Sequence, residues 1–470
     1  MRRTANAVTP TEPIAPRGRS SLGSPTISAS LVFHLLLSLS IAVFLVVASP
    51  PDASATVIVV DAAGGGDYLS VQEGVAAAAS GDTVQVMAGW YAERVLVDGK
   101  CLTIQGSGPS GTAVFWDGAG PTLEFVNAPS SGWSHIRSIN IARSFDQAEG
   151  VRGGDRQVHT VEWTGCTVVF DGAVINGGAI GIADVENHLV HTGVSAYDST
   201  FDWLIVAGDR YFTIDNSFIF EGARFSGWYE DPMTMASPFV TSTGSYYGGL
   251  ELPMLCYISS FQDSIGRLEI AGSFETSCTA SFQECGISYA LMWNDNDVAF
   301  HNCIVNEVSH FYSGYPGFRL TMEGCLVGNF DMLSDAGDCR LIHNTFTEWF
   351  YCQLDDDVPG SAIRSNIFTG YTSIIAEGGP GSDPRLPVTH NLFEHHETYV
   401  TALYDSLAVN FWYEDPRFCG WSTYTLEDCS PCIGAAHDGG TIGAFGIGCD
   451  CTLVNAVEEK SWGAIKALYR

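Results

Sequence analysis

The sequence predicts an all-β protein, a right-handed parallel β-helix in which coils of about 22 residues stack along one axis. Two columns of residues and one pattern predict it. Large apolar residues recur every 20 to 25 residues, a small residue or Asn recurs two positions before each of them, and the segments alternate in polarity as strands do. The apolar column consists of Phe218, Phe239, Phe261, Phe282, Ile304, Leu326, Phe346, Phe368 and Phe393.

Both columns have a physical meaning in a stack of coils. Because neighbouring strands lie ~4.8 Å apart, equivalent residues stack, and we expect the apolar column to form one aromatic ladder inside the solenoid. The second column is expected at a bend between strands, where Asn tolerates the left-handed conformation and bonds to the Asn of the next coil. Its members are Asn216, Ser237, Ser259, Ala280, Asn302, Gly324, Asn344, Asn366 and Asn391.

The N-terminal 55 residues have the composition of a targeting segment. Arg2, Arg3, Arg17 and Arg19 precede an almost wholly apolar run at 31–48, and Ala53-Ser54-Ala55 has the small-x-small pattern of a signal-peptidase site. We expect residues 1–55 to be a signal peptide and the product to be secreted or held at the cell surface. The alternative is an uncleaved membrane anchor, since 18 apolar residues nearly span a bilayer.

A short helix is expected next, over about residues 70–80. In "YLSVQEGVAAAASGD" the residues Ser70 and Glu73 form a capping box, an apolar stripe follows, and Gly81 stands where a helix would end. The glycines at 64–66 also suggest a phosphate-binding loop, but neither G-x-G-x-x-G nor Gly-Lys-Ser/Thr occurs here. The sequence therefore predicts a helix that caps the open end of the solenoid.

The charge and the cysteine content of the chain indicate which partners are unfavourable and whether disulfides are expected. The formal net charge is −32, and removal of residues 1–55 takes away four basic and two acidic residues, leaving 17 against 51 and a net charge of −34. Such a surface repels phosphate backbones, so nucleic acid is not expected as a partner. All 14 cysteines follow residue 55, which in an oxidising compartment favours several disulfides.

Two segments carry a resemblance to known proteins. The runs "GGGDYLSVQEGVAAA", "GDTVQVMAGWYAERVLVDG" and "LTIQGSG" within residues 56–118 resemble the start of the pectin-lyase-like parallel β-helix superfamily, and Gly89-x-Tyr91-x-Glu93 is similar to the start of pectin methylesterases. Residues 414–449 resemble the anchor-type segment that closes many exported bacterial β-helix proteins. The implied organisation is a targeting segment (1–55), a β-helix with its cap (56–412), a Cys-rich closing segment (413–452) and a tail (453–470).

The methylesterase activity of that superfamily is not expected here. The resemblance implies two Asp carboxylates and an Arg in one groove, but only Gln262-Asp263-Ser264 partly matches the first Asp motif, and no Arg-Pro occurs in the chain. Asp263 has an acidic counterpart in Glu284 one coil later, so we interpret it as a solvated position.

Two other kinds of site remain open in the sequence. A polysaccharide lyase or glycoside hydrolase would need carboxylates, and a basic residue for a lyase, on neighbouring coils; the candidates are Asp297, Asp335, Asp357 and Arg267. Asp335 and Asp357 share an offset from the apolar column and are expected to stack. Carboxylates that could bind Ca²⁺ are Asp295, Asp297, Asp355 and Asp357.

Each of these candidates also has a purely structural interpretation, which we favour. Acidic turns are common and solvated in solenoids, and Arg224 and Arg267 would then pair with surface acids. His301, His343 and His390 are interpreted as residues that flank the turn rather than as metal ligands, because no carboxylate recurs beside them.

Aromatic residues indicate a route to carbohydrate. Trp349 and Tyr371 each lie three residues after the apolar column on successive coils, so they predict either an exposed platform for sugar rings or a second internal stack. The favoured function is an exported, surface-associated protein that binds polysaccharide along one flank and requires no cofactor. The alternatives are a divergent lyase or glycoside hydrolase, and an adhesin or structural rod that binds protein; membrane contact is expected only through an uncleaved N-terminal segment or a C-terminal anchor.

Overall fold

The structure is a computed structural model, and residues 1–54 lie outside the part it describes. The chain divides into two units, Met1–Ser54 and Ala55–Arg470, and every described residue belongs to the second. Among the described residues no helix is both long and apolar enough to cross a membrane. The described ranges are 55–129, 132–144, 155–163, 167–171, 173–182, 194–207, 211–226, 228–229, 235–236, 239–252, 256–271, 277–293, 296–311, 318–334, 338–355, 360–377, 386–401, 409–420 and 423–451.

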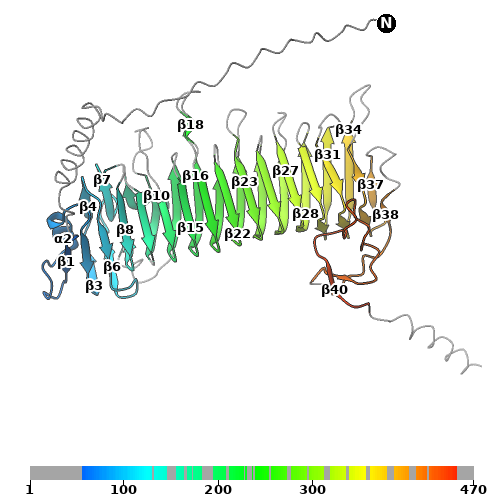
Figure 1. The fold of residues 1–470 in the computed structure, drawn as a ribbon. Coiled ribbons are helices and arrows are strands. Elements are labelled where there is room, and N and C mark those ends of the chain that lie inside the picture. Colours follow the sequence, from blue (N-terminus) through cyan, green and yellow to red (C-terminus); the bar gives the residue numbers. More distant parts are fainter. Residues whose placement is uncertain are drawn as a thin grey trace, which may run out of the picture. The chain divides into compact units, whose positions relative to one another are not determined.

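The unit from Ala55 onward is a parallel β-helix, as predicted (Figure 1). Its described strands form two long parallel sheets, one of 15 strands and one of 21. The 15-stranded sheet contains β1 (Val57–Val60), β2 (Thr83–Val86), β5 (Thr103–Gln105), β8 (Trp133–Arg137), β11 (Thr167–Asp171), β13 (Val194–Tyr197), β15 (Tyr211–Asp215), β19 (Phe239–Thr243), β21 (Tyr257–Phe261), β23 (Thr279–Gln283), β25 (Asp297–His301), β27 (Arg319–Glu323), β29 (Asp338–Ile342), β32 (Ala362–Arg364) and β35 (Val388–Thr389).

The second sheet follows the first around each coil and holds the longest strands. Its members are β3 (Gly89–Ala92), β4 (Val95–Asp98), β6 (Thr112–Phe115), β7 (Leu123–Val126), β9 (Asn140–Ala142), β10 (Asp155–Trp163), β12 (Val174–Ile182), β14 (Thr200–Ala207), β16 (Phe218–Ser226), β20 (Tyr246–Leu252), β22 (Ser264–Ala271), β24 (Gly286–Trp293), β26 (Ile304–Phe311), β28 (Leu326–Ser334), β30 (Thr345–Phe346), β31 (Phe350–Asp355), β33 (Ile367–Phe368), β34 (Thr372–Glu377), β36 (Leu392–Phe393), β37 (Thr398–Val400) and β38 (Phe411–Trp412). Two short pairs complete the described strands, β17 (Trp228–Tyr229) with β18 (Met235–Ala236) and β39 (Leu426–Glu427) with β40 (Ile447–Cys449).

The single aromatic ladder expected from the apolar column is wrong, although its period is right. Phe282 lies in the 15-stranded sheet, where it is buried and stacks on Phe300 with ring centroids 5.2 Å apart. Phe346 and Phe368 lie in the other sheet and stack there at 5.1 Å. Phe261 pairs with Gln283 rather than with Phe282. Because coils differ in loop length, a column counted along the sequence passes from one sheet to the other.

In most described coils one residue in the left-handed conformation makes the bend between the two sheets. The φ angle is 53° at Asn302, 67° at Gly324 and 56° at His343. The next residue points into the coil and is buried at most turns. This inner turn column consists of Ser199, Ser217, Ser245, Asp263, Cys285, Cys303, Cys325, Asn344, Asn366, Asn391 and Asn410.

The predicted ladder of Asn side chains is confirmed in the last coils. The backbone N–H and Nδ2 of Asn344 both donate to Oδ1 of Asn366, at 2.9 and 3.1 Å. Asn366 donates in the same way to Asn391, and Asn391 donates to Asn410. Each buried backbone N–H at this turn thereby finds an acceptor in the following coil, which a buried donor requires.

The N-terminal helix α2 (Val71–Ala77) is present and is shorter than the predicted range. Ser70 caps it, since its Oγ accepts from the N–H of Glu73 at 3.2 Å. The helix ends at Ala77, so Gly81, although its φ is 94°, lies beyond the end. Val71 and Val75 are buried against the first coils and close that end of the core.

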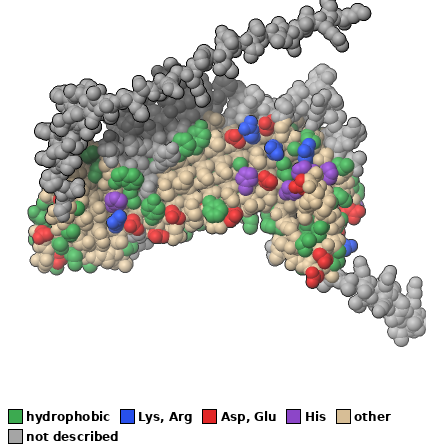
Figure 2. Space-filling model, in the orientation of Figure 1, with side chains coloured by type: hydrophobic (Ala, Val, Ile, Leu, Met, Phe, Trp, Pro, Cys, Tyr) green, Lys and Arg blue, Asp and Glu red, His purple; other side chains and the backbone are tan. Residues whose placement is uncertain are grey.

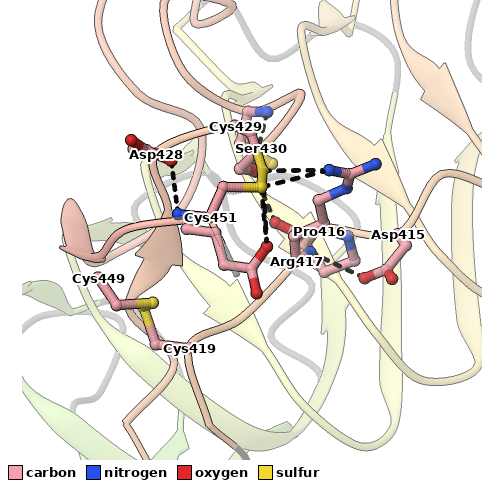
Figure 3. Close-up of a disulfide and its surroundings, with 11 residues drawn as sticks. Asp415, Pro416, Arg417, Cys419, Asp428, Cys429, Ser430, Cys449 and Cys451 are labelled. Carbon is pink, nitrogen blue, oxygen red and sulfur yellow. Dashed lines mark hydrogen bonds between the residues drawn. A yellow bond between two sulfur atoms is a disulfide. The ribbon is translucent and has the colours of Figure 1, made fainter. Parts of the chain in front are cut away.

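The C-terminal segment from about residue 413 covers the last described coils. Two disulfides, Cys419–Cys449 and Cys429–Cys451, hold it together, and Arg417 donates to Sγ of Cys429 at 3.1 Å (Figure 3). It shares a small buried core with the coils, made of Ile367, Leu392, Leu426, Cys432, Ala436 and Ile442.

Candidate functional site

The aromatic pair expected from the sequence lies at the surface. Trp349 directly precedes β31 and Tyr371 directly precedes β34, and their rings stack with centroids 4.5 Å apart and an interplanar angle of 22°. The exposed fraction of Trp349 is 48%, so the pair is not an internal stack. The structure therefore brings the two predicted residues together, and their role in binding remains a prediction.

Two glycines let the backbones of successive coils approach closely at this pair and one coil before it. A Cβ atom at Gly370 would collide with the carbonyl oxygen of Glu348 in the preceding coil, and one at Gly328 would collide with that of Asn306. Glycine thus lets successive turns pass at backbone contact distance. The backbone N–H of Trp349 also donates to Oδ1 of Asn329 at 3.3 Å, which ties the turn to the coil before it.

A row of polar side chains runs beside the aromatic pair on the outward face of the 21-stranded sheet. Register places Asp331 against Tyr351, and Tyr351 against Ser373, on three successive coils. The hydroxyl of Tyr351 donates to Oε1 of Gln353 at 2.6 Å. We call Asn329, Asp331, Trp349, Tyr351, Gln353 and Tyr371 the aromatic flank.

Asp331 is a functional candidate that the sequence analysis missed. Its side chain is exposed, and partial desolvation by its neighbours raises the pKa of its carboxyl above the ordinary value for Asp. The signal was present in "NFDML", where the buried residues Phe330 and Met332 alternate with Asp331 and so place it on the outer face.

A surface depression lies on the same sheet as the aromatic flank, several coils earlier. It has a volume of about 320 Å³ and is lined by Gly222, Gly248, Gly249, Leu250, Glu251, Arg267 and Glu269. Arg267 donates to Glu269 at 3.1 Å and lies over the ring of Tyr289 at 5.8 Å. Arg224 lies 3.9 Å from Glu251. Both arginines thus pair with surface acids, which was their structural interpretation.

Of the residues proposed for catalysis, the structure describes Asp297 and Arg267, and it places them in different sheets. Asp297 begins β25 in the 15-stranded sheet, whereas Arg267 belongs to β22 in the other sheet. Asp297 is 3.2 Å from Arg319, whose guanidinium also lies 3.7 Å from Asp338. These three side chains form an ion-pair row across three coils at the surface.

The other acidic candidates fall largely outside the description. Asp295, Asp335 and Asp357 lie outside the described residues, so the expected stacking of Asp335 on Asp357 stays a prediction. Asp355 ends β31, where its backbone pairs with that of Glu377.

Asp263 is buried, contrary to the expectation that it is solvated. It is 2% exposed, accepts from the backbone N–H of Ser245 at 2.7 Å and from the hydroxyl of Ser260 at 2.5 Å, and its equivalent in the next coil is Cys285. The counterpart of Glu284 is Gln262, which donates to it at 2.9 Å. The partial match to a methylesterase motif is therefore a turn inside the coil, closed to solvent.

Most described cysteines are free thiols in the core. Eight described cysteines after residue 255 form no disulfide, and all eight are buried: Cys256, Cys278, Cys285, Cys303, Cys325, Cys339, Cys352 and Cys432. Burial raises the pKa of Cys278 to about 11 and that of Cys432 to about 11. The expected disulfides occur in the C-terminal segment, where Cys429 of the C-x-x-C sequence pairs with Cys451 rather than with Cys432.

Comparison with known proteins shows no family for this chain. No protein-family model matches the sequence, and no curated protein matches it. Among solved structures the chain is similar to a pectin methylesterase from carrot, with 12% identity, 78% of this chain and 90% of that chain covered, and a TM-score of 0.19. That likeness carries no argument about activity, so function must be argued from the surface itself.

Proposed function

We propose that this is an exported protein that binds polysaccharide along the aromatic flank. The carrying observation is the exposed stack of Trp349 on Tyr371. Aromatic faces suit the apolar faces of sugar rings, while the adjacent hydroxyl, amide and carboxyl groups supply hydrogen bonds to sugar hydroxyls. The two disulfides of the C-terminal segment support passage through an oxidising compartment.

The charge of the chain favours an uncharged polysaccharide. The formal net charge is −32, and the described residues of the aromatic flank include Asp331 and no basic side chain. A polyuronate would be repelled by this field, whereas a neutral glycan would not. We therefore expect binding to neutral chains that persists at high salt.

Binding is tested with a panel of neutral and uronate glycans. The Trp349→Ala variant should bind at least ~10-fold more weakly, equivalent to about 1.4 kcal/mol, because it loses the stacking face. Trp133→Ala removes an exposed Trp (58%, against 48% for Trp349) from the 15-stranded sheet and should bind as the wild type does. Equal affinity of wild type and Trp349→Ala for every glycan would contradict the proposal.

A divergent hydrolase or lyase is the second candidate, and Asp331 favours it. A carboxyl whose pKa is raised by partial desolvation and that stays accessible is suited to donate a proton, and Asp331 lies in the flank against Tyr351. Incubation with the same glycans should then release reducing or unsaturated ends, and Asp331→Asn should abolish them while binding persists. Binding without product identifies a binding protein, and neither binding nor product favours the protein-binding rod.

A further inference from the structure

Three potential metal ligands meet where the C-terminal segment contacts the coils. His343 occupies the bend between β29 and β30, and His437 and Asp438 come from the segment that follows the coils. One ligand atom of each lies within 4.8 Å of the other two. Histidine side chains gather with acidic and basic ones at this end of the coils (Figure 2).

One polar atom of each group is already held by a hydrogen bond. Nδ1 of His343 is 2.8 Å from the carbonyl oxygen of Thr441, and Nδ1 of His437 is 2.8 Å from Oγ of Ser365. Oδ1 of Asp438 accepts from the backbone N–H of Gly440 at 2.9 Å. Metal ligands are typically oriented by partners of this kind.

In its neutral form, His343 presents a lone pair to a carboxylate oxygen at the centre of the cluster. A carbonyl can only accept, so Nδ1 of His343 carries the hydrogen, and in the neutral ring Nε2 then presents a lone pair. That lone pair lies 3.3 Å from Oδ2 of Asp438, which is also an acceptor. Two acceptors at this separation need a proton or a cation between them.

We propose that His343, His437 and Asp438 bind a divalent metal ion of the zinc type. Two ligands of a tetrahedral zinc ion with bonds of about 2.0–2.1 Å lie ~3.3 Å apart, which matches the separation of Nε2 and Oδ2. Two imidazoles and one carboxylate favour zinc over Ca²⁺ and Mg²⁺, which prefer oxygen ligands.

The ion would fasten the closing segment to the coils. The same contact already includes the N–H of Gly443 donating to the carbonyl of Ser365 at 2.8 Å and the N–H of Ala444 donating to Oγ1 of Thr345 at 3.1 Å. A metal bound only in the folded state raises its stability. Because His343 and Asp438 are 95 residues apart in sequence, the site exists only when the segment is docked.

The test is metal binding by the purified, oxidised protein without an affinity tag. After treatment with a chelator, the wild type should take up about one equivalent of Zn²⁺, melt at a higher temperature with Zn²⁺ than without it, and respond little to Ca²⁺. Asp438→Asn removes the carboxylate, yet its amide can still donate to Nε2 of His343, so the fold is kept while Zn²⁺ binding weakens at least ~10-fold. His343→Ala should weaken binding likewise.

His301→Ala is the matched control. His301 lies 3.7 Å from Glu323 but has no third ligand in the described part of the chain, so its loss should leave Zn²⁺ binding unchanged. Uptake far below one equivalent by the wild type would overturn the proposal and leave a proton between His343 and Asp438. Wild-type affinity in Asp438→Asn and His343→Ala would overturn it as well.

Discussion

At the scale of single residues, the inner turn column controls how each coil closes on the next. Ser217, Ser245 and Asp263 accept from the backbone N–H of the preceding coil just as the Asn residues do further along. Three quite different side chains thus perform one task, which is to supply an acceptor to a buried donor. Asp263 performs it as a carboxylate, and burial raises its pKa.

Asp263→Asn should change how stability depends on pH. The unfolded carboxyl titrates near ~3.9 and the folded one at a higher pKa, so its contribution to the free energy of unfolding is full below the unfolded pKa and is lost as pH rises through the folded pKa. Wild type should therefore lose stability relative to the variant on going from roughly pH 4 toward neutral. Urea unfolding at several pH values measures this, and a constant difference between the two proteins would contradict it.

At the scale of elements, helix α2 depends on a carboxylate from the coil beneath it. Glu93 accepts from Oγ of Ser70 at 2.9 Å and from the backbone N–H groups of Val71 and Gln72 at 2.8 and 2.9 Å. These are donors of the first turn that have no partner within the helix. Tyr91, two residues earlier, is buried, and its hydroxyl donates to the carbonyl of Met87 at 3.1 Å.

Glu93→Ala should loosen the cap while Glu73→Ala should not. Loss of three hydrogen bonds to a carboxylate is expected to cost about 1–3 kcal/mol of local stability. Amide hydrogen exchange across α2 measures it directly. If Glu73 completed a capping box through its side chain, as the sequence suggested, Glu73→Ala would be the damaging change instead.

At the scale of the described molecule, stability is shared between neighbouring coils and the two closed ends. Each coil contacts mainly the coils before and after it, so unfolding can begin at an end that has lost its cover. Helix α2 covers the first coils, and the disulfide-bonded segment packs on Ile367 and Leu392 of the last ones.

Removing the disulfide Cys419–Cys449 by double substitution to Ser should expose the last coils first. The bond closes a loop of 30 residues, and its loss is expected to cost about 2–4 kcal/mol. Hydrogen exchange should then rise in β33, β36 and β38 before it rises in β21 or β23. As a control, the stability of a variant that lacks both disulfides should not change when reductant is added. Equal loss of hydrogen-exchange protection along all coils would contradict this account.

The fold could be predicted from the sequence because the repeat length and the alternation of buried and exposed residues are the same in both sheets. Neither depends on which sheet a given residue belongs to. The assignment of Phe261 and Phe346 to one column failed because both sheets show the same alternation of buried and exposed residues. Alternation alone does not identify the sheet in which a strand lies. The same slip of one position placed Asp263 in solvent, beside Glu284, when its true equivalent is the buried Cys285.

The candidate sites differ in how much of each could be predicted from the sequence. Trp349 and Tyr371 were paired correctly because a single coil separates them. Asp331 was recoverable from its own strand. The contact of His343 with Asp438 was not, because it depends on where a segment 95 residues away docks. No local sequence pattern predicts a contact between residues so far apart in the chain. The carboxylate partner of His343 is therefore identified only by the structure.

The run of Cys285, Cys303 and Cys325 along the inner turn column constrains the order of events during maturation. A chain that arrives unfolded among oxidants exposes these sulfurs together with those of Cys419 and Cys449, and any two can be joined in error. Once the coils have closed, the three are buried, and the described disulfides lie in the terminal segment. If the chain is exported as proposed, we expect correct bridging only when the solenoid winds before its last segment is crosslinked.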